Sequence, residues 1–239
     1  MIFLTGDTHG NFARIIDFTK KHNTTKDDLL IMLGDVAINY LGKIDDAPCK
    51  HHLNKLPITF LCIHGNHEMR PESLPEYKEI EWNEGLVYME PKYPFLLFAK
   101  DGEVYNLNGT RCIAIGGAYS IDKFHRLMRG LEWWKDEQPS AEIKQRVEKK
   151  LDSLNWTIDV VLSHTAPMKY EPHKVSLEIY GGFKIDKSTE EWLNSIEDRL
   201  TYKKWYCGHF HTNKIIDKMR FLYKDFVELY EYTERTGRL

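Results

Sequence analysis

The sequence predicts an α/β fold built on a parallel sheet, and two observations support that prediction. Five short apolar runs are each followed at once by polar residues, which is typical of buried strands that end at a functional edge. The first three runs alternate with segments of helical spacing, and the order βαβαβ implies right-handed crossovers between parallel strands. With 239 residues, 42% of them apolar and 29% charged, the chain is expected to form a single domain over 1–239.

The first part of the chain is expected to supply three strands and two helices in alternation. Strands are expected at 2–4, 29–33 and 58–63, and the second is almost wholly apolar, as a strand covered on both faces should be. Helices are expected at 11–21 and 45–56, where apolar residues recur at helical spacing.

The middle of the chain changes character. Between Trp82 and Ser120, short runs of β-formers are broken by Asp101-Gly102 and Asn108-Gly109, which are hairpin signals. We expect these runs to form a meander and hence a second, mixed sheet.

The last part returns to strands and helices. Ser140 is the expected N-cap of a helix whose apolar stripe runs to Leu154. Strands are expected at 160–162 and 204–207. The alternation between 214 and 229 predicts two closing antiparallel strands.

Composition limits the function classes. The net charge of -3 gives no overall attraction to nucleic acid or to a membrane surface. The N-terminus lacks the basic start and long apolar run of a signal peptide, and no run approaches the ~18 apolar residues of a membrane span. The four scattered cysteines, without a CxxC pair, are typical of reduced thiols. We therefore expect a cytoplasmic protein with no membrane segment.

The polar clusters after the five strands carry the functional signal. They are Gly6-Asp7-Thr8-His9-Gly10, Gly34-Asp35, Gly65-Asn66-His67-Glu68, Ser163-His164 and Gly208-His209-Phe210-His211. In extended backbone, residues i and i+2 point to the same side, so each of the two Asp/His or His/His pairs is expected to bind one ion. The seven candidate ligands exceed what one ion takes, which favours two ions sharing a bridging carboxylate. The alternative, that the clusters are ordinary turns, does not explain why all five follow strands.

The ligand types indicate which metals are expected. Imidazole and carboxylate without thiolate favour Mn²⁺, the first choice, or Fe, Zn, Ni or Co. Two divalent ions bring four positive charges, of which two aspartates and a bridging hydroxide cancel three. The remaining charge suits a phosphate ester, and the amide of Asn66 adds a ligand without further negative charge.

In their types and order, these clusters resemble the signature of the calcineurin-like metallophosphoesterase superfamily: D-x-H, G-D, G-N-H-[DE], H and G-H-x-H. The resemblance spans residues 6–211 and implies a four-layer α-β-β-α sandwich, with two mixed sheets flanked by helices. It also implies the ligands of each ion: Asp7, His9, Asp35 and His211 for the first, and Asp35 (bridging), Asn66, His164 and His209 for the second. His67 would be the acid that protonates the leaving group, while a metal-bridging hydroxide attacks phosphorus in line.

The sequence departs from one branch of this superfamily at the second cluster. The protein Ser/Thr phosphatase branch carries G-D-x-V-D-R-G there, whereas this chain has Ile38 in place of the aspartate that would orient the catalytic histidine and Asn39 in place of the phosphate-binding arginine. A protein phosphatase is therefore disfavoured, and the sequence does not identify what orients His67.

Two further residues are candidate substrate contacts. Asn39 lies four residues past Asp35, and its alternative role is to cap the loop. Arg126 follows a glycine-rich exit from the meander and could place a cation over the phosphate; its alternative role is a structural pair with an aspartate.

The sequence thus predicts a metal-dependent phosphoesterase that hydrolyses phosphomonoesters or phosphodiesters, with a small nucleotide-type substrate. The alternatives are a nuclease of the same superfamily, which would bind nucleic acid, and a metal-binding scaffold that has lost turnover. The ligands and His67 are all present, which argues against the scaffold. The oligomeric state is not predicted.

Overall fold

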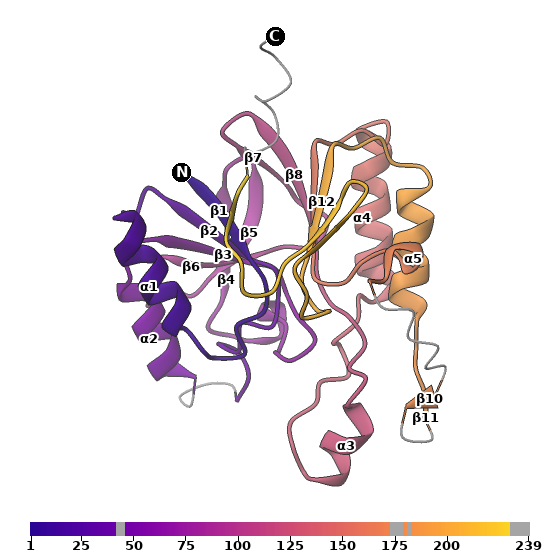
Figure 1. Cartoon of the computed structure of the whole chain (residues 1–239), viewed down its shortest axis with the longest axis horizontal. Coiled ribbons are helices and arrows are strands. Elements are labelled where there is room, and N and C mark those ends of the chain that lie inside the picture. The colour runs from indigo at the N-terminus through magenta and orange to yellow at the C-terminus, as the bar shows by residue number, and fades with distance from the viewer. Residues whose placement is uncertain (42–45, 173–178, 181–182, 230–239) are drawn as a thin grey trace.

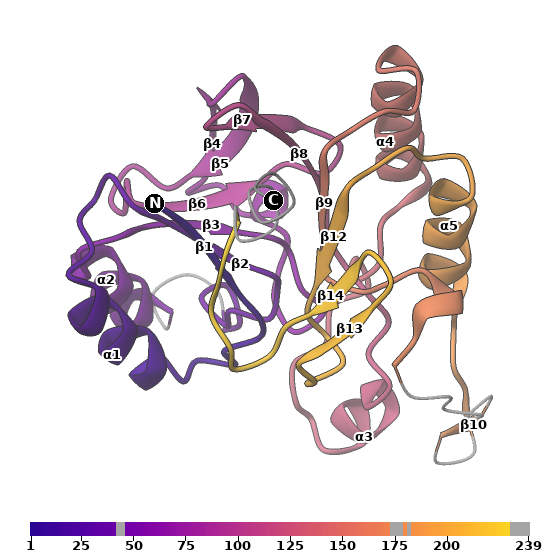
Figure 2. The same ribbon diagram turned by 45° about the horizontal axis from the view of Figure 1, so that its top comes forward.

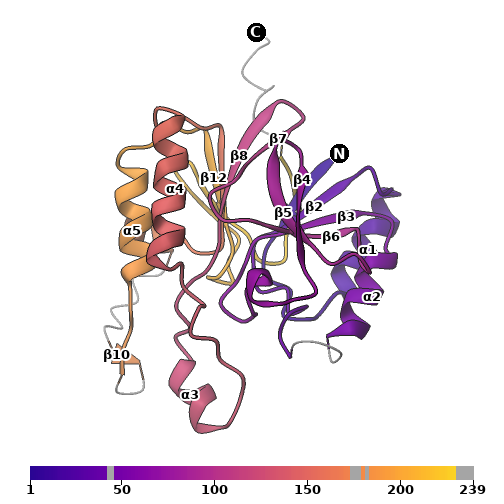
Figure 3. The ribbon, with the colours of Figure 1, turned by 180° about the vertical axis from the view of Figure 1, so that it is seen from behind.

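The computed structural model of the chain describes residues 1–41, 46–172, 179–180 and 183–229 (Figure 1). Two β-sheets pack against each other at the centre, and a pair of helices covers the outer face of each (Figures 1 and 3). The expected four-layer α/β sandwich is therefore confirmed.

The first sheet contains the three N-terminal strands. Its order is β15-β1-β2-β3-β6-β5-β4, with bounds β1 Ile2–Thr5, β2 Leu29–Met32, β3 Thr59–Cys62, β4 Lys78–Trp82, β5 Gly85–Met89, β6 Leu96–Ala99 and β15 Val227–Glu228. Strands β1, β2, β3 and β6 pair in parallel, as the βαβαβ pattern predicts, while β15 and β5 run antiparallel to their neighbours.

The second sheet contains the other two strands that precede polar clusters. Its order is β13-β14-β12-β9-β8-β7, with bounds β7 Val104–Leu107, β8 Thr110–Ile115, β9 Val160–Ser163, β12 Lys204–Cys207, β13 Lys214–Ile216 and β14 Met219–Phe221. The four inner strands are parallel and both edge strands are antiparallel (Figure 2).

The meander expected between 82 and 120 does not form one sheet. Strands β4, β5 and β6 extend the first sheet, and β7 and β8 belong to the second. The chain crosses between the sheets at Asp101-Gly102, where Gly102 has a φ of 85°. The closing segment is divided in the same way, because β13 and β14 form the expected antiparallel pair and β15 returns to the first sheet.

Helices α1 (Ala13–His22) and α2 (Ala47–Lys55) cover the first sheet, and α4 (Ala141–Ser153) and α5 (Ser188–Glu197) cover the second (Figure 3). The N-cap prediction is confirmed, since the Ser140 hydroxyl accepts a hydrogen bond from the Ile143 amide at 3.3 Å. The stripe of α4 buries Ile143, Val147 and Leu151.

Three apolar layers hold these elements together. The central layer joins both sheets, for example through Leu4 of β1 and Leu162 of β9, and the two outer layers lie between each sheet and its helices, around Ile15 and Trp205. The four cysteines are free. None of the helices in the described ranges has the length and apolarity needed to cross a bilayer.

Two segments project from the same end of the sandwich (Figures 1 and 3). One carries the short helix α3 (Lys123–Met128), and the other is the pair β10 (Ile179–Tyr180) and β11 (Phe183–Lys184). Short 3₁₀ turns lie at Pro71–Ser73 and Met168–Tyr170.

Candidate metal centre and active site

All five polar clusters lie at the carboxyl ends of parallel strands, three in the first sheet and two in the second. The two sheets meet at this edge. The His209 amide, after a strand of the second sheet, donates to Oδ1 of Asp7 in the first at 2.9 Å, and Nδ1 of His164 lies 2.7 Å from the Leu33 carbonyl oxygen. Side chains more than 200 positions apart in sequence therefore share one site, as His9 and His211 do.

One group of candidate ligands consists of Asp7, His9 and His211. The Nε2 atoms of His211 and His9 lie 3.1 Å and 3.8 Å from Oδ2 of Asp7, and they are 2.9 Å from each other. Asp7 is buried, whereas the two imidazoles are exposed. This group is thus open to solvent on its histidine side.

A second group consists of Asn66, His164 and His209. Asn66 Oδ1 lies 2.8 Å from Nε2 of His164 and 3.1 Å from Nδ1 of His209. Nδ1 of His164 lies 2.7 Å from the carbonyl oxygen of Leu33, which can only accept, so Nδ1 carries a proton. In the neutral ring Nε2 then carries the lone pair, the arrangement in which histidine binds a metal.

Asp35 lies between the two groups. Its Oδ2 is 3.9 Å from Nε2 of His9 in the first group, and its Oδ1 is 3.5 Å from Nε2 of His164 in the second. Oδ1 also accepts a hydrogen bond from the His67 amide at 2.9 Å. One carboxylate therefore faces both groups.

The predicted extended backbone around the ligand pairs is wrong. His9, Asp35, His209 and His211 have φ values of 46°, 48°, 63° and 47°, in the left-handed region. The side chains converge because the chain turns sharply after each strand, and the turns send His209 and His211 into different groups. Such conformations cost of order 1 kcal/mol each and persist where the surrounding structure imposes them.

Glycines at two clusters allow the sheets to approach. A Cβ on Gly34, whose φ is 95°, would lie 2.0 Å from Nδ1 of His164. A Cβ on Gly208 would lie 2.3 Å from Oδ1 of Asp7. Each glycine thus makes room for a ligand delivered by the opposite sheet.

Two residues outside the predicted set of ligands and substrate contacts hold the loops in place. Arg14, on α1, donates from Nη2 to the carbonyls of Gly6 and Asp7 at 2.7 and 2.9 Å. Glu68 is fully buried and accepts from the amides of Gly65 and Ala37, both at 3.1 Å. Burial and the charge of Asp35 raise the pKa of Glu68 to about 8.

The ionisation of the ligands suits metal binding. Burial would raise the pKa of Asp7, but the hydrogen bond to His211 and the nearby imidazoles lower it to about 2. Burial and the neighbouring His164 hold the pKa of His209 well below its ordinary value. Asp7 is thus anionic and His209 neutral near neutral pH, the states in which they bind cations.

The spacing of the donor atoms also fits. Donors bound at about 2.1 Å to one ion lie about 3.0 Å apart in an octahedral site and about 3.4 Å apart in a tetrahedral one. The separations given above run from 2.8 Å for Asn66 and His164 to 3.9 Å for Asp35 and His9 and bracket both values. In the second group, an amide oxygen faces imidazole nitrogens, and a shared cation relieves the repulsion between their lone pairs.

His67 lies beside these groups and lines the same pocket. Its Nε2 is 3.9 Å from Oδ1 of Asp122, a buried atom with no hydrogen-bond partner among the described residues. Burial lowers the pKa of His67, while Asp35 and Asp122 act to raise it. Asp122 was not assigned a role from the sequence, because its approach to His67 depends on how the segment before α3 packs.

Neither of the two candidate substrate contacts lines this pocket. Arg126 donates to the Glu132 carbonyl at 2.8 Å, contacts Asp122 Oδ2 at 3.4 Å and hydrogen-bonds the Tyr40 hydroxyl. Asn39 is fully buried and accepts from the Tyr77 hydroxyl at 3.0 Å. The guanidinium is thus engaged by protein partners, and Asn39 is covered by the protein.

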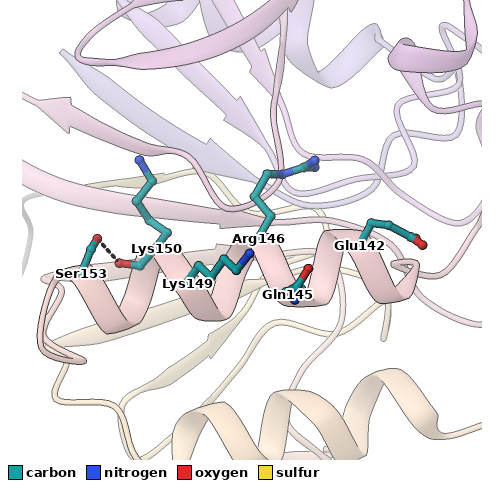
Figure 4. Close-up of a pocket in the computed structure, with 6 residues that line it drawn as sticks. All are labelled: Glu142, Gln145, Arg146, Lys149, Lys150 and Ser153. Carbon is teal, nitrogen blue, oxygen red and sulfur yellow. Dashed lines mark hydrogen bonds between the residues drawn. The ribbon is translucent and has the colours of Figure 1, made fainter.

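The pocket beside the ligands has a volume of about 390 Å³. Asp35, Asn66, His209 and His211 line it with His67, and so do residues that adjoin the two projecting segments, among them Ile121 and Ile185. A different hollow, of about 420 Å³, runs along α4 (Figure 4). It is lined by solvated side chains, and its Arg146 and Lys150 pair with the Asp101 carbonyl and Glu103.

Comparisons with known proteins bear on the family and the fold of this chain. The family profile described as calcineurin-like phosphoesterase matches residues 1–229. One solved crystal structure aligns with a TM-score of 0.50 and 11% identity over 92% of this chain and 88% of its own, which supports the fold. A protein of unknown function from Aquifex aeolicus aligns with a TM-score of 0.33 and 15% identity over 69% of this chain and 80% of its own. No curated protein matches. The chain belongs to the calcineurin-like phosphoesterase family.

Proposed function

We propose that this protein is a phosphoesterase that uses two divalent transition-metal ions, Mn²⁺ in the first instance, to hydrolyse a small phosphomonoester or phosphodiester. Asp7, His9 and His211 would hold one ion, and Asn66, His164 and His209 the other. When bound, such a pair supplies an activated water and offsets the negative charge of the phosphoryl group.

The observation that carries this proposal is the position of Asp35 between two groups of donors, 3.9 Å from His9 and 3.5 Å from His164. A single-ion site would leave one of these groups without a role. Two carboxylates and one neutral amide also keep the negative charge of the site low, which favours an anionic substrate.

His67 is proposed as the acid that gives a ring proton to the oxygen of the departing alcohol. It lines the pocket without belonging to either donor group, so it can face the ester. Asp122, 3.9 Å from Nε2, is the residue that would orient it in place of the aspartate missing at Ile38.

A small substrate is favoured over a nucleic acid by the size of the pocket. About 390 Å³ lies at the lower end of the range for small-molecule sites. Residues that adjoin the two projecting segments, Ile121 and Ile185 among them, also line the pocket, and these segments would restrict the approach of a long duplex.

The proposal is tested by loading metal-stripped protein with Mn²⁺ and offering p-nitrophenyl phosphate and bis-p-nitrophenyl phosphate. We expect two ions per chain and turnover of at least one ester. Binding of two ions without turnover of either ester would favour a metal-binding scaffold. Preference for the diester together with cleavage of oligonucleotides would favour a nuclease.

A further inference from the structure

The pocket beside the metal ligands also has an apolar wall. Ile121, Ile185 and Phe210 line it, and they come from three separate places: the segment before α3, the residue after β11, and the loop after β12, between His209 and His211. Ile185 is buried and Phe210 half-buried, whereas 49% of Ile121 is exposed. An exposed isoleucine that lines a polar pocket together with two other apolar side chains marks a place where a ligand, rather than the protein, completes the contact.

The charges around this wall would not recognise a second phosphate. Lys187 is the lysine or arginine among the described residues that line this pocket. Its Nζ is paired with Oε1 of Glu171 at 2.8 Å. Asp122 adds a further carboxylate. A polyphosphate chain placed here would meet two carboxylates and an already paired ammonium group.

We infer that Ile121, Ile185 and Phe210 form a slot for the organic group of the ester, and that the substrate class is a compact ester with one phosphate and an uncharged, largely apolar organic group. This inference rests on the proposed function, since the phosphate must lie at the ligand wall for its organic group to reach the slot. The volume of about 390 Å³ accommodates a phosphoryl group with a single ring system of this kind.

The test compares two esters whose leaving alcohols differ only in apolar surface: ethyl phosphate and 2-phenylethyl phosphate. Because both esters release a primary alcohol, their intrinsic reactivities are similar. Burying the ring against three apolar side chains should raise kcat/KM by about 10-fold or more, mostly through KM. Equal kcat/KM for the two esters would overturn the inference.

Ile121→Ser is the informative variant, because the side chain is half exposed and its replacement should not disturb the core. It should lower kcat/KM several-fold more for 2-phenylethyl phosphate than for ethyl phosphate. Leu127→Ser is the matched control, since Leu127 is also 49% exposed but does not line the pocket. An equal loss for both esters in Ile121→Ser would contradict the slot.

Binding separates this inference from the proposed function. If neither nitrophenyl ester is turned over by Mn²⁺-loaded protein, the proposed function fails, and calorimetry with ethylphosphonate and 2-phenylethylphosphonate then measures the slot alone. We expect the phenyl compound to bind about 10-fold more tightly and Ile121→Ser to remove the difference. Equal affinities would exclude the slot whatever the catalytic outcome.

Discussion

Replacing Asp35 by asparagine is the sharpest test of a shared metal centre. The change preserves shape, and an amide oxygen can still accept the hydrogen bond from the His67 amide that Oδ1 now accepts at 2.9 Å. It removes one negative charge from a side chain that faces both donor groups. If Asp35 bridges, both ions must lose affinity together.

The size of the effect follows from the distances. Unit charges about 4 Å apart interact by about 4 kcal/mol at an effective dielectric constant of about 20, and Asp35 lies within that distance of donors in both groups. Residues that only support a ligand change metal affinity by about 10–100-fold. Loss of a directly bound charge should therefore weaken each ion by at least about 100-fold, or about 2.7 kcal/mol.

The assay is metal content after dialysis, followed by titration calorimetry with Mn²⁺. Asp122→Asn is the matched control, because it removes a carboxylate from the same pocket that belongs to neither donor group, and it should leave two ions bound. The metal-free Asp35→Asn protein should melt no lower than the wild type, since the buried carboxylates of Asp7 and Asp35 repel each other. Two ions per chain at unchanged affinity would refute the bridge, and loss of one ion alone would assign Asp35 to a single group.

Three other predictions address separate parts of the site. His67→Ala should retain both ions and lower kcat by about 10²–10⁴-fold for alkyl esters. If Asp122 acts through His67, adding Asp122→Asn to His67→Ala should lower kcat no further, whereas additive losses in kcat would show that the two residues act independently. Gly208→Ala should lower metal affinity and thermal stability together, because its Cβ would lie 2.3 Å from Asp7 Oδ1, and an unchanged melting temperature would contradict the close approach. In metal-free protein, the Glu68 carboxyl has a pKa of about 8 when folded and about 4.5 when unfolded, so the unfolding free energy of the wild type should fall relative to that of Glu68→Gln as pH rises between these values. Urea denaturation at about pH 5 and about pH 8 measures this change. A constant difference in unfolding free energy between the two proteins would show that Glu68 does not titrate in this way.

The features that the sequence predicted well are those specified by consecutive residues. An apolar run such as Leu29–Met32 followed by Gly34-Asp35 carries both the strand and the ligand within a few consecutive residues, and the parallel order of the strands brings such ends to one edge. Helices α1, α2 and α4 were predicted for the same reason, since signals such as the apolar stripe and the Ser140 cap of α4 lie in consecutive residues.

The features that the sequence did not predict depend on contacts between segments that are distant in the chain. Runs of β-formers between turn signals indicate strands from β5 to β8, but not that β6 pairs with β3 while β8 pairs with β9, so the meander was placed in one sheet and is found in two. The extended geometry assumed for the histidine pairs was wrong because nothing in a His-x-His pattern specifies left-handed φ values.

The same limit explains why the partner of His67 was missing from the sequence analysis. The second cluster has Ile38 where an orienting aspartate would be expected, and Ile38 is fully buried in the layer between the first sheet and its helices. The carboxylate that faces Nε2 of His67 comes instead from Asp122, in the segment before α3, where Arg126 pairs with it and hydrogen-bonds Tyr40. Ser120, two residues earlier, accepts from the side-chain amide of Asn66 at 2.8 Å. A single projecting segment thus contacts a candidate ligand, faces the proposed acid and supplies Ile121 to the apolar wall, so a change at Ile121 should alter substrate preference while leaving the contact between Ser120 and Asn66 intact.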